Sequence, residues 1–245
     1  MPKFLGLGVQ KGGTTTLQLL LEQHPQVWLP PKKELHYFSL HYARGAQWYS
    51  DCFVEAKAKQ CCGEITPYYI FHPQAPQRIA ELIPDARLIV LLRDPVERCL
   101  SQYFHSCRWG LETLGLEQAL AAEEDRLLGA ELMLAPVGAT HRSHQEHSYL
   151  ARSRYEEQLA RYELLFPSVQ MLVLRSEDLF KDGPSVWELV QNFLRLDVVP
   201  FPDGVAPANA GGGEASSVPV RVCQQLREQL APTYLAIKER YGISW

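Results

Sequence analysis

Apolar residues in this chain occur either in short continuous runs or at helical spacing, and the two patterns alternate. Short runs rich in aliphatic residues, at 4–9, 87–92 and 170–175, are typical of parallel strands buried on both faces. The alternation of strands and helices predicts an α/β fold. We expect the helices from Thr14 onward, from Pro95 onward, and over 73–83, 116–128, 149–166, 184–196 and 220–241, the last bent at Pro232.

The loop between the first strand and the first helix has the composition of an anion site. It contains glycines, one lysine and three threonines, which run up to the predicted helix start. Glycine allows close approach of the backbone to a ligand, and the unpaired N–H groups at a helix N-terminus favour a negative charge. The loop therefore predicts phosphate binding.

The loop differs from the Walker A pattern of nucleotide hydrolases at one decisive position. Gly8, Gly13 and Thr15 match the pattern, but Thr14 stands where the nucleotide-binding lysine is expected, and the lysine is Lys11. Hydrolysis of ATP needs that lysine on the β- and γ-phosphates together with a bound Mg²⁺. The displacement argues against ordinary ATP hydrolysis while leaving the anion site intact.

A second polar cluster follows the strand at 87–92. Asp94 is a natural N-cap and Pro95 suits the first helical position, so Arg93 lies at the carboxyl end of the strand and Ser101 about two turns along the helix. Ligands of parallel α/β sheets bind outside the carboxyl ends of the strands. We expect Arg93, Ser101 and the glycine loop to face one ligand.

The segment from Lys32 to Phe38 places two lysines, Glu34 and His36 close together. Taken alone, the pattern fits a solvated charged loop. A positioned carboxylate or imidazole is also the group that would remove a proton from an attacking hydroxyl.

These three stretches together resemble the sulfotransferases that use 3′-phosphoadenosine 5′-phosphosulfate (PAPS). The motifs are Lys11-Gly12-Gly13-Thr14-Thr15, the R-D-P-x-x-R-x-x-S pattern from Arg93 to Ser101, and a K-E-x-H-[FY]-F stretch from Lys33 to Phe38. Their order and spacing are closest to heparan sulfate-type carbohydrate sulfotransferases and their bacterial relatives, over roughly Lys3 to Leu196. The resemblance implies a three-layer α/β sandwich with a central parallel sheet, the P-loop NTPase-like sulfotransferase fold.

The resemblance also implies a role for each motif in sulfuryl transfer from PAPS, with release of PAP. Glu34 would be the catalytic base, and His36 would orient it, bind the acceptor or be the base itself. Arg93 and Ser101 would hold the 3′-phosphate, and Lys11 would neutralise the departing bridging oxygen. The 5′-phosphosulfate would lie against Lys11, Gly12, Gly13, Thr14, Thr15 and Thr16. The scheme requires no metal.

Two departures from the family pattern keep other functions open. Heparan-type relatives often carry a lysine where this chain has Ile65, and no lysine or arginine other than Arg195 lies between Lys181 and Arg221 to close over PAPS. The alternatives are a nucleotide kinase or NTPase, or a non-catalytic nucleotide-binding module. The acceptor is expected to be a saccharide or small molecule that offers a hydroxyl rather than an amine.

Length, composition and net charge limit the expected number of domains, the binding partners and the cellular location. The 245 residues, 46% hydrophobic and 21% charged, are sufficient for a single sulfotransferase domain over 1–245. A net charge of −4 does not favour nucleic acid or an anionic membrane as partner. No apolar run of about 18 residues and no leader-like start are present, so we expect a cytoplasmic protein without an integral membrane segment. The oligomeric state is left open.

The cysteines and histidines do not predict a metal centre. Six cysteines without C-x-x-C pairing are interpreted as free thiols. His141, His144 and His147 recur every three residues in a polar stretch, 129–148, that we expect to be an irregular loop beside the acceptor. On a helix they would share a face, but no cysteine lies nearby and the helical pattern is weak.

Overall fold

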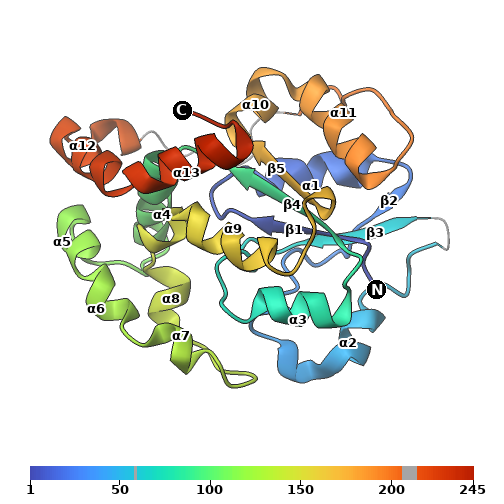
Figure 1. Ribbon diagram of the computed structural model, residues 1–245, viewed down its shortest axis with the longest axis horizontal. Coiled ribbons are helices and arrows are strands. Elements are labelled where there is room, and N and C mark those ends of the chain that lie inside the picture. Colours follow the sequence, from blue (N-terminus) through green and yellow to red (C-terminus); the bar gives the residue numbers. More distant parts are fainter. Residues whose placement is uncertain (58–59, 206–213) are drawn as a thin grey trace.

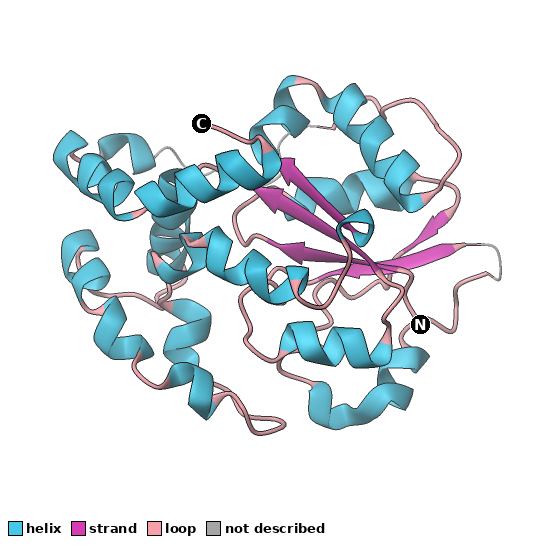
Figure 2. Ribbon diagram, in the orientation of Figure 1, coloured by secondary structure: helices cyan, strands magenta, loops and turns pink. Residues whose placement is uncertain are grey.

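The computed structural model describes residues 1–57, 60–205 and 214–245, and in this part five parallel strands form one sheet (Figures 1 and 2). The strand order is β2-β3-β1-β4-β5, so β2 and β3 lie on one side of β1 and the later strands β4 and β5 lie on the other. Such a reversal of strand order opens a crevice at the carboxyl end of the central strand. The strands are β1 (Phe4–Gly8), β2 (Val27–Trp28), β3 (Cys61–Ile65), β4 (Arg87–Leu92) and β5 (Met171–Arg175).

Helices cover both faces of the sheet, which gives the expected three layers (Figure 1). Side chains alternate along β1, so Phe4 belongs to one apolar cluster while Leu5 and Leu7 belong to the other. The Phe4 face is covered by α1 (Thr14–Gln23), α10 (Ser176–Lys181) and α11 (Gly183–Leu194). The opposite face is covered by α2 (Gly45–Asp51), α3 (Ala75–Leu82), α9 (Tyr155–Glu163) and α13 (Ala231–Tyr241).

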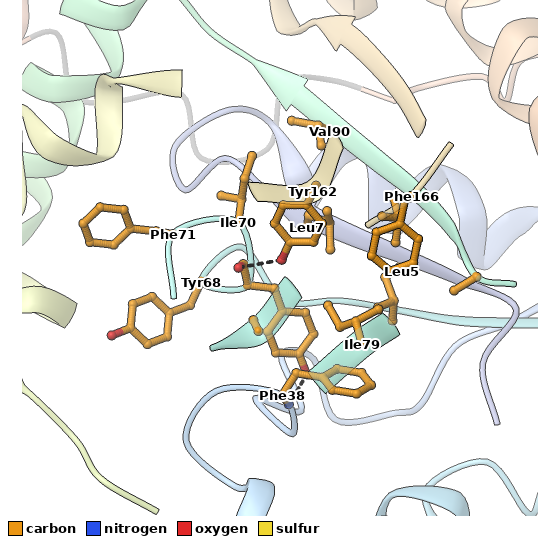
Figure 3. Packing of buried hydrophobic residues seen from close by; sticks show 14 of the residues in the cluster. Leu5, Leu7, Phe38, Tyr68, Ile70, Phe71, Ile79, Val90, Tyr162 and Phe166 are labelled. Atoms are coloured by element: carbon orange, nitrogen blue, oxygen red, sulfur yellow. Dashed lines mark hydrogen bonds between the residues drawn. The ribbon is translucent and has the colours of Figure 1, made fainter. Parts of the chain in front are cut away.

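Aromatic residues fill the space between the sheet and α9. Figure 3 shows Tyr162 packed near Leu7, and its hydroxyl donates to the carbonyl of Tyr69 at 2.8 Å. In the same cluster Tyr49 is fully buried and Phe53 is 6% exposed. The cluster fixes the chain after β3 against the sheet.

A third apolar cluster lies beyond the carboxyl ends of the strands, at the left of Figure 1. It joins α4 (Pro95–Arg108) to α12 (Val220–Gln229) through residues such as Leu100, Tyr149 and Leu226. The short helices here are α5 (Leu116–Ala121), α6 (Glu123–Leu127), α7 (Ala130–Met133) and α8 (Arg142–Glu146). Single 3₁₀ turns occur at Tyr42–Arg44, Ala151–Ser153, Ser168–Gln170 and Glu214–Ser217.

The helices predicted over 116–128 and 149–166 are both interrupted, and Glu123 connects the two interrupted segments. Ala122 separates α5 from α6, so the expected helix over 116–128 is in two pieces. The buried Glu123 carboxylate accepts the N–H groups of Tyr149 and Leu150 at 2.9 and 2.8 Å and that of Ala151 at 2.7 Å. These contacts fix the start of the second segment, where Ala151–Ser153 form a separate 3₁₀ turn. Helix α9 begins only after Arg154, whose ψ of 75° is not helical.

Other expectations for the helices and loops need smaller corrections. In the helix predicted over 149–166, helical spacing places Leu165 on the inward face, but Leu165 is 40% exposed and Phe166, 3% exposed, fills that place. The stretch 129–148 is not irregular throughout, since it contains α7 and α8. The helix over 220–241 ends and restarts at Leu230, and Pro232 lies in the first turn of α13 rather than at a bend.

The C-terminal residues pack back on the end of the sheet through Trp245. Its indole Nε1 donates to Glu177 Oε2 at 2.9 Å. The stretch 201–218, rich in glycine, alanine and proline, is predicted from the sequence to be a loop, and its residues 206–213 lie outside the described residues. Within the described part of the chain, no helix combines the length and the apolar character needed to cross a membrane.

Candidate active site

The glycine loop joins β1 to α1 along the end of β4. Gly12 passes so close to β4 that a side-chain Cβ there would lie 2.6 Å from the Leu91 carbonyl oxygen, so only glycine fits. Gly13, with φ of 88°, precedes the first residue of α1, Thr14. Positive φ favours glycine at this turn, which directs the chain into the helix. The loop therefore presents the amino end of α1 at the crevice.

Positive charges converge on Lys11. The pKa of Lys11 is lowered, first by burial and then by the charges of Arg108 and Arg93. The guanidinium of Arg93 is 3.5 Å from the Lys11 carbonyl and 3.2 Å from the carboxylate of Glu97. Mutual repulsion of cations in a partly buried site is relieved by an anion.

The start of α4 has the capped geometry that the sequence predicted. The carboxylate of Asp94 accepts the N–H of Glu97 at 3.0 Å, and Pro95 is the first helical residue. This cap fixes Arg93 between the end of β4 and the helix. Ser101 lies further along α4 and is 9% exposed.

Glu34 and His36 form a pair on a segment with unusual backbone geometry. Both residues have positive φ, 57° and 54°, which non-glycine residues adopt only when their surroundings impose it. His36 Nε2 lies 3.4 Å from Glu34 Oε2. The structure thus brings the candidate base and its candidate partner into direct contact.

Lys33, which the sequence reasoning did not single out, connects this pair to the glycine loop. Its ammonium donates to Thr15 Oγ1 at 2.6 Å and lies 3.9 Å from Glu34 Oε1. Thr15 is in the first turn of α1. The lysine therefore links the candidate base to the amino end of α1, the candidate phosphate site.

The environment keeps Glu34 ionised. Burial acts to raise its pKa, but the hydrogen bond and charge of His36, followed by the charges of Lys33 and Arg152, outweigh burial and lower the pKa. A carboxylate that is charged at neutral pH is ready to accept a proton.

A second carboxylate, Glu64 near the end of β3, stabilises the segment that carries Glu34 through hydrogen bonds. Glu64 is 2% exposed and accepts the hydroxyls of Tyr49 and Tyr69 at 2.8 and 2.7 Å, and that of Thr66 at 2.7 Å. It also accepts the backbone N–H of Leu35. Burial raises the pKa of Glu64 against these hydrogen bonds. No local sequence pattern predicts this network of hydrogen bonds around Glu64.

Two of the hydroxyl groups bound to Glu64 also accept backbone N–H groups of the segment that carries Glu34. Thr66 Oγ1 accepts the N–H of His36 at 3.4 Å, and the Tyr69 hydroxyl accepts the N–H of Phe38 at 3.4 Å (Figure 3). With the Leu35 amide, three N–H groups of the segment are held by one buried network. This explains how two residues with left-handed backbone, Glu34 and His36, persist on either side of Leu35.

A pocket of about 250 Å³ opens beside Glu34 and His36. Its other walls come from the end of β3, α4 and the α8 region, which includes part of the loop predicted beside the acceptor. Ile65 does not line it: that side chain is 2% exposed and packs against Gly6 in the core. The pocket is lined by Gln10, Glu34, His36, Pro67, Tyr68, Gln102, His105, Ser106, Leu111, Gln145, Glu146 and Arg152.

The three histidines after 140 have separate structural roles. His141 caps α8 by accepting the N–H of His144 at 3.1 Å. His144 is buried, 2.9 Å from the Tyr68 hydroxyl, and stacks on Phe71. His147 Nε2 lies 3.0 Å from the Leu111 carbonyl. Among the described residues, no group of three or more potential ligands is arranged to hold a metal ion.

Comparison with known proteins identifies the family. Residues 2–202 match the family model described as sulfotransferase domain. Human heparan sulfate glucosamine 3-O-sulfotransferase 6 is 32% identical over 195 residues, covering 80% of this chain and 52% of that protein. The membrane-associated sulfotransferase kil1 of Dictyostelium discoideum is 43% identical over 112 residues, covering 44% of this chain and 24% of its own length. The chain thus spans about half or less of these relatives.

Solved structures agree with this assignment. The sulfotransferase from Alicyclobacillus acidocaldarius superposes with a TM-score of 0.80 at 26% identity, covering 100% of this chain and 97% of that one. Mouse sulfotransferase SULT7A1 complexed with PAP shares the fold, with a TM-score of 0.58 at 12% identity and coverage of 99% and 89%. The predicted fold and enzyme class are confirmed: this chain belongs to the sulfotransferase family.

Proposed function

We propose that this chain transfers a sulfuryl group from PAPS to a hydroxyl of an acceptor and releases PAP. The observation that carries the proposal is the position of Lys33, which joins Thr15 at the start of α1 to Glu34 at the acceptor pocket. Phosphate site and candidate base are thereby adjacent. The family match supports sulfuryl transfer and does not favour the kinase or NTPase alternative.

The nucleotide would occupy the crevice at the carboxyl ends of β1 and β4. In the proposal, the 5′-phosphosulfate lies against Lys11, the amides of Gly12 and Gly13, and the helix start at 14–16, and Arg93 with Ser101 holds the 3′-phosphate. The cationic cluster around Lys11 supports this arrangement. A mouse sulfotransferase of the same fold is complexed with PAP, which supports PAP as the released product.

The reaction follows from these positions. Glu34 takes the proton of the acceptor hydroxyl as its oxygen forms a bond to sulfur. The bond from sulfur to the bridging oxygen breaks, and PAP leaves with the electron pair, which Lys11 neutralises. His36, 3.4 Å from Glu34, orients the carboxylate. No metal ion takes part in this scheme.

The acceptor is proposed to be a saccharide or small-molecule hydroxyl. Relatives whose names refer to heparan sulfate glucosamine support a saccharide. We also propose a cytoplasmic location, supported by six free thiols, which a reducing compartment maintains. Because one relative is named as membrane-associated, cell fractionation is the test of this location, and we expect the protein in the cytosolic fraction.

Nucleotide titration tests the proposal against its rivals. PAP should bind without Mg²⁺ and more tightly than ATP, whereas a kinase or NTPase would prefer ATP with Mg²⁺. Labelled PAPS then reports turnover, which a non-catalytic binding module would lack. Binding of ATP with Mg²⁺ in preference to PAP would overturn the proposal.

Replacing Arg93 by Ala tests the 3′-phosphate assignment. Loss of a charge-assisted hydrogen bond should weaken PAP by about 1.5–3 kcal/mol and leave adenosine 5′-phosphosulfate, which has no 3′-phosphate, nearly unaffected. Calorimetric titration of both ligands measures the difference. Equal losses for the two ligands would remove Arg93 from this role.

A further inference from the structure

Arg108, the last residue of α4, lies on the face of that helix that also carries Ser101 and His105. The three residues are separated by four and three positions, which is the spacing of neighbours on one side of an α-helix. Ser101 is the residue proposed to hold the 3′-phosphate, and His105 lines the pocket beside Glu34. Arg108 therefore continues the ligand-facing side of α4, about two turns beyond Ser101.

The charge of Arg108 acts on the glycine loop. After burial, it is the largest cause that lowers the pKa of Lys11, ahead of the charge of Arg93. It also lowers the pKa of His105, the residue one turn before it. The end of α4 thus brings a guanidinium close to the lysine that is proposed to neutralise the bridging oxygen.

A carboxylate from the late part of the chain, Glu214, lies against these cations. Its Oε1 is 2.8 Å from Arg108 Nη1, and its charge raises the pKa of Lys11 against the effect of the arginines. Glu214 begins the 3₁₀ turn Glu214–Ser217, and Ala215 of this turn packs on the apolar cluster of α4. The turn therefore holds a negative charge at the position where the cations of the candidate phosphate site meet.

The ion pair between Arg108 and Glu214 is accessible to solvent. The two side chains are 40% and 36% exposed, whereas Glu112, in its ion pair with Arg126, is only 1% exposed. An exposed ion pair contributes little to stability because water solvates both partners when they separate. Arg108 can therefore exchange Glu214 for another anion at little cost to the fold.

We propose that Arg108 binds the 5′-phosphosulfate of PAPS together with Lys11, and that Glu214 occupies Arg108 until the nucleotide binds. The carboxylate and the phosphosulfate both place negative charge against the same cations. Each therefore opposes the binding of the other, and Glu214 lowers the affinity of the site for its nucleotide. The inference rests on the proposed function and adds a residue pair that sets nucleotide affinity.

Arg108→Ala tests the contact with the 5′ end of the nucleotide. We expect the dissociation constants of PAP and of adenosine 5′-phosphosulfate each to rise about 10-fold, because both ligands carry the 5′-phosphate. Calorimetric titration measures both constants, and the thermal midpoint without ligand reports folding. Arg221→Ala, which removes an arginine from another exposed ion pair, is the matched control and should change neither constant. A loss confined to PAP, or no loss for either ligand, would overturn the proposal.

Glu214→Gln removes the competing charge and keeps the shape of the side chain. We expect this variant to bind both ligands about 3-fold more tightly, and to gain less in the Arg108→Ala background, because the carboxylate competes for that arginine. Glu117→Gln, which removes the carboxylate of the exposed pair with Arg221, should leave both affinities unchanged. No gain in Glu214→Gln, or an equal gain with and without Arg108, would overturn the competition. Failure of the unmodified protein to bind PAP would instead overturn the proposed function.

Discussion

At the scale of single residues, the role of Glu34 can be separated from that of His36. Glu34→Gln keeps the size of the side chain and its hydrogen bonding but removes proton acceptance. We expect turnover to fall roughly 10²–10⁴-fold at unchanged PAP affinity, because a general base contributes about that much. His36→Ala, measured by the same turnover assay, should cost less because the imidazole only orients the carboxylate. A dead His36 variant beside an active glutamine variant would reverse the assignment.

The pH profile provides an independent check on the same prediction. The folded-state pKa of Glu34 lies below its usual value of 4.5, so the carboxylate is charged above that pH and loses activity only as the pH falls through the lowered value. The acid limb of kcat/KM should therefore lie below pH 4.5. A limb near pH 6.5, where imidazoles ordinarily titrate, would contradict a carboxylate base.

The sequence singled out the charged residues proposed for the site but not the contacts that arrange them. Glu34, His36, Lys11 and Arg93 were predicted because they stand in motifs. The contact of Lys33 with Thr15 and the network beneath Glu34 depend on chain segments meeting in space. No spacing rule encodes such meetings, and positive φ at Glu34 is likewise imposed from outside the segment.

At the scale of elements, Glu112 holds the segment after α4 to α6 and to Tyr149. Its side chain is 1% exposed and accepts from Arg126 at 2.6 Å and from the Tyr149 hydroxyl at 2.8 Å. Burial acts to raise the pKa of Glu112, but the hydrogen bonds from Arg126, the Leu114 amide and Tyr149 outweigh it and lower the pKa to about 2. Stability from this group is therefore complete above pH 4.5 and is lost as the pH falls towards 2.

We expect Glu112→Gln to lower the free energy of unfolding at pH 7 and to reduce its loss between pH 7 and pH 3. The titration of this one carboxyl accounts for on the order of 3 kcal/mol over the full acid range. Urea unfolding at both pH values measures the effect. Glu117→Gln, which removes an exposed pair with Arg221, is the control and should change little. Equal pH dependence in the Glu112 variant and the unmodified protein would contradict the prediction.

Strand positions were easier to predict than helix ends. β4 has the predicted bounds because a run of aliphatic residues buried on both faces is a local signal. The helix expected over 116–128 is divided at Ala122, and the one expected over 149–166 begins only at Tyr155, because the carboxylate of Glu123 binds three amides at the start of that segment. A long-range contact of this kind overrides local helical spacing.

At the scale of the whole molecule, the C-terminal helices are tied to the carboxyl end of β4, where the nucleotide is proposed to bind. The Tyr234 hydroxyl of α13 donates to Asp94 at 2.8 Å, and Ile237 is buried in the cluster on β1 and β4. Asp94 is the cap beside Arg93. The last helix therefore helps to fix Asp94, the residue next to the arginine proposed to hold the 3′-phosphate.

These connections lead us to propose that residues 1–245 unfold as one unit. Thermal transitions followed by far-ultraviolet circular dichroism, near-ultraviolet circular dichroism and calorimetry should coincide. Saturating PAP should raise the single midpoint because it binds only the folded chain. Two separate transitions, of which PAP shifts only one, would contradict a single domain.

The network around Glu64 has a consequence for engineering. The segment 32–38 owes its shape to a carboxylate on β3 and to the hydroxyls of Tyr69 and Thr66. Copying that segment alone onto another scaffold would transfer the reactive groups without their arrangement. The smallest portable unit consists of two stretches of chain, and a designer who moves one has to move the other.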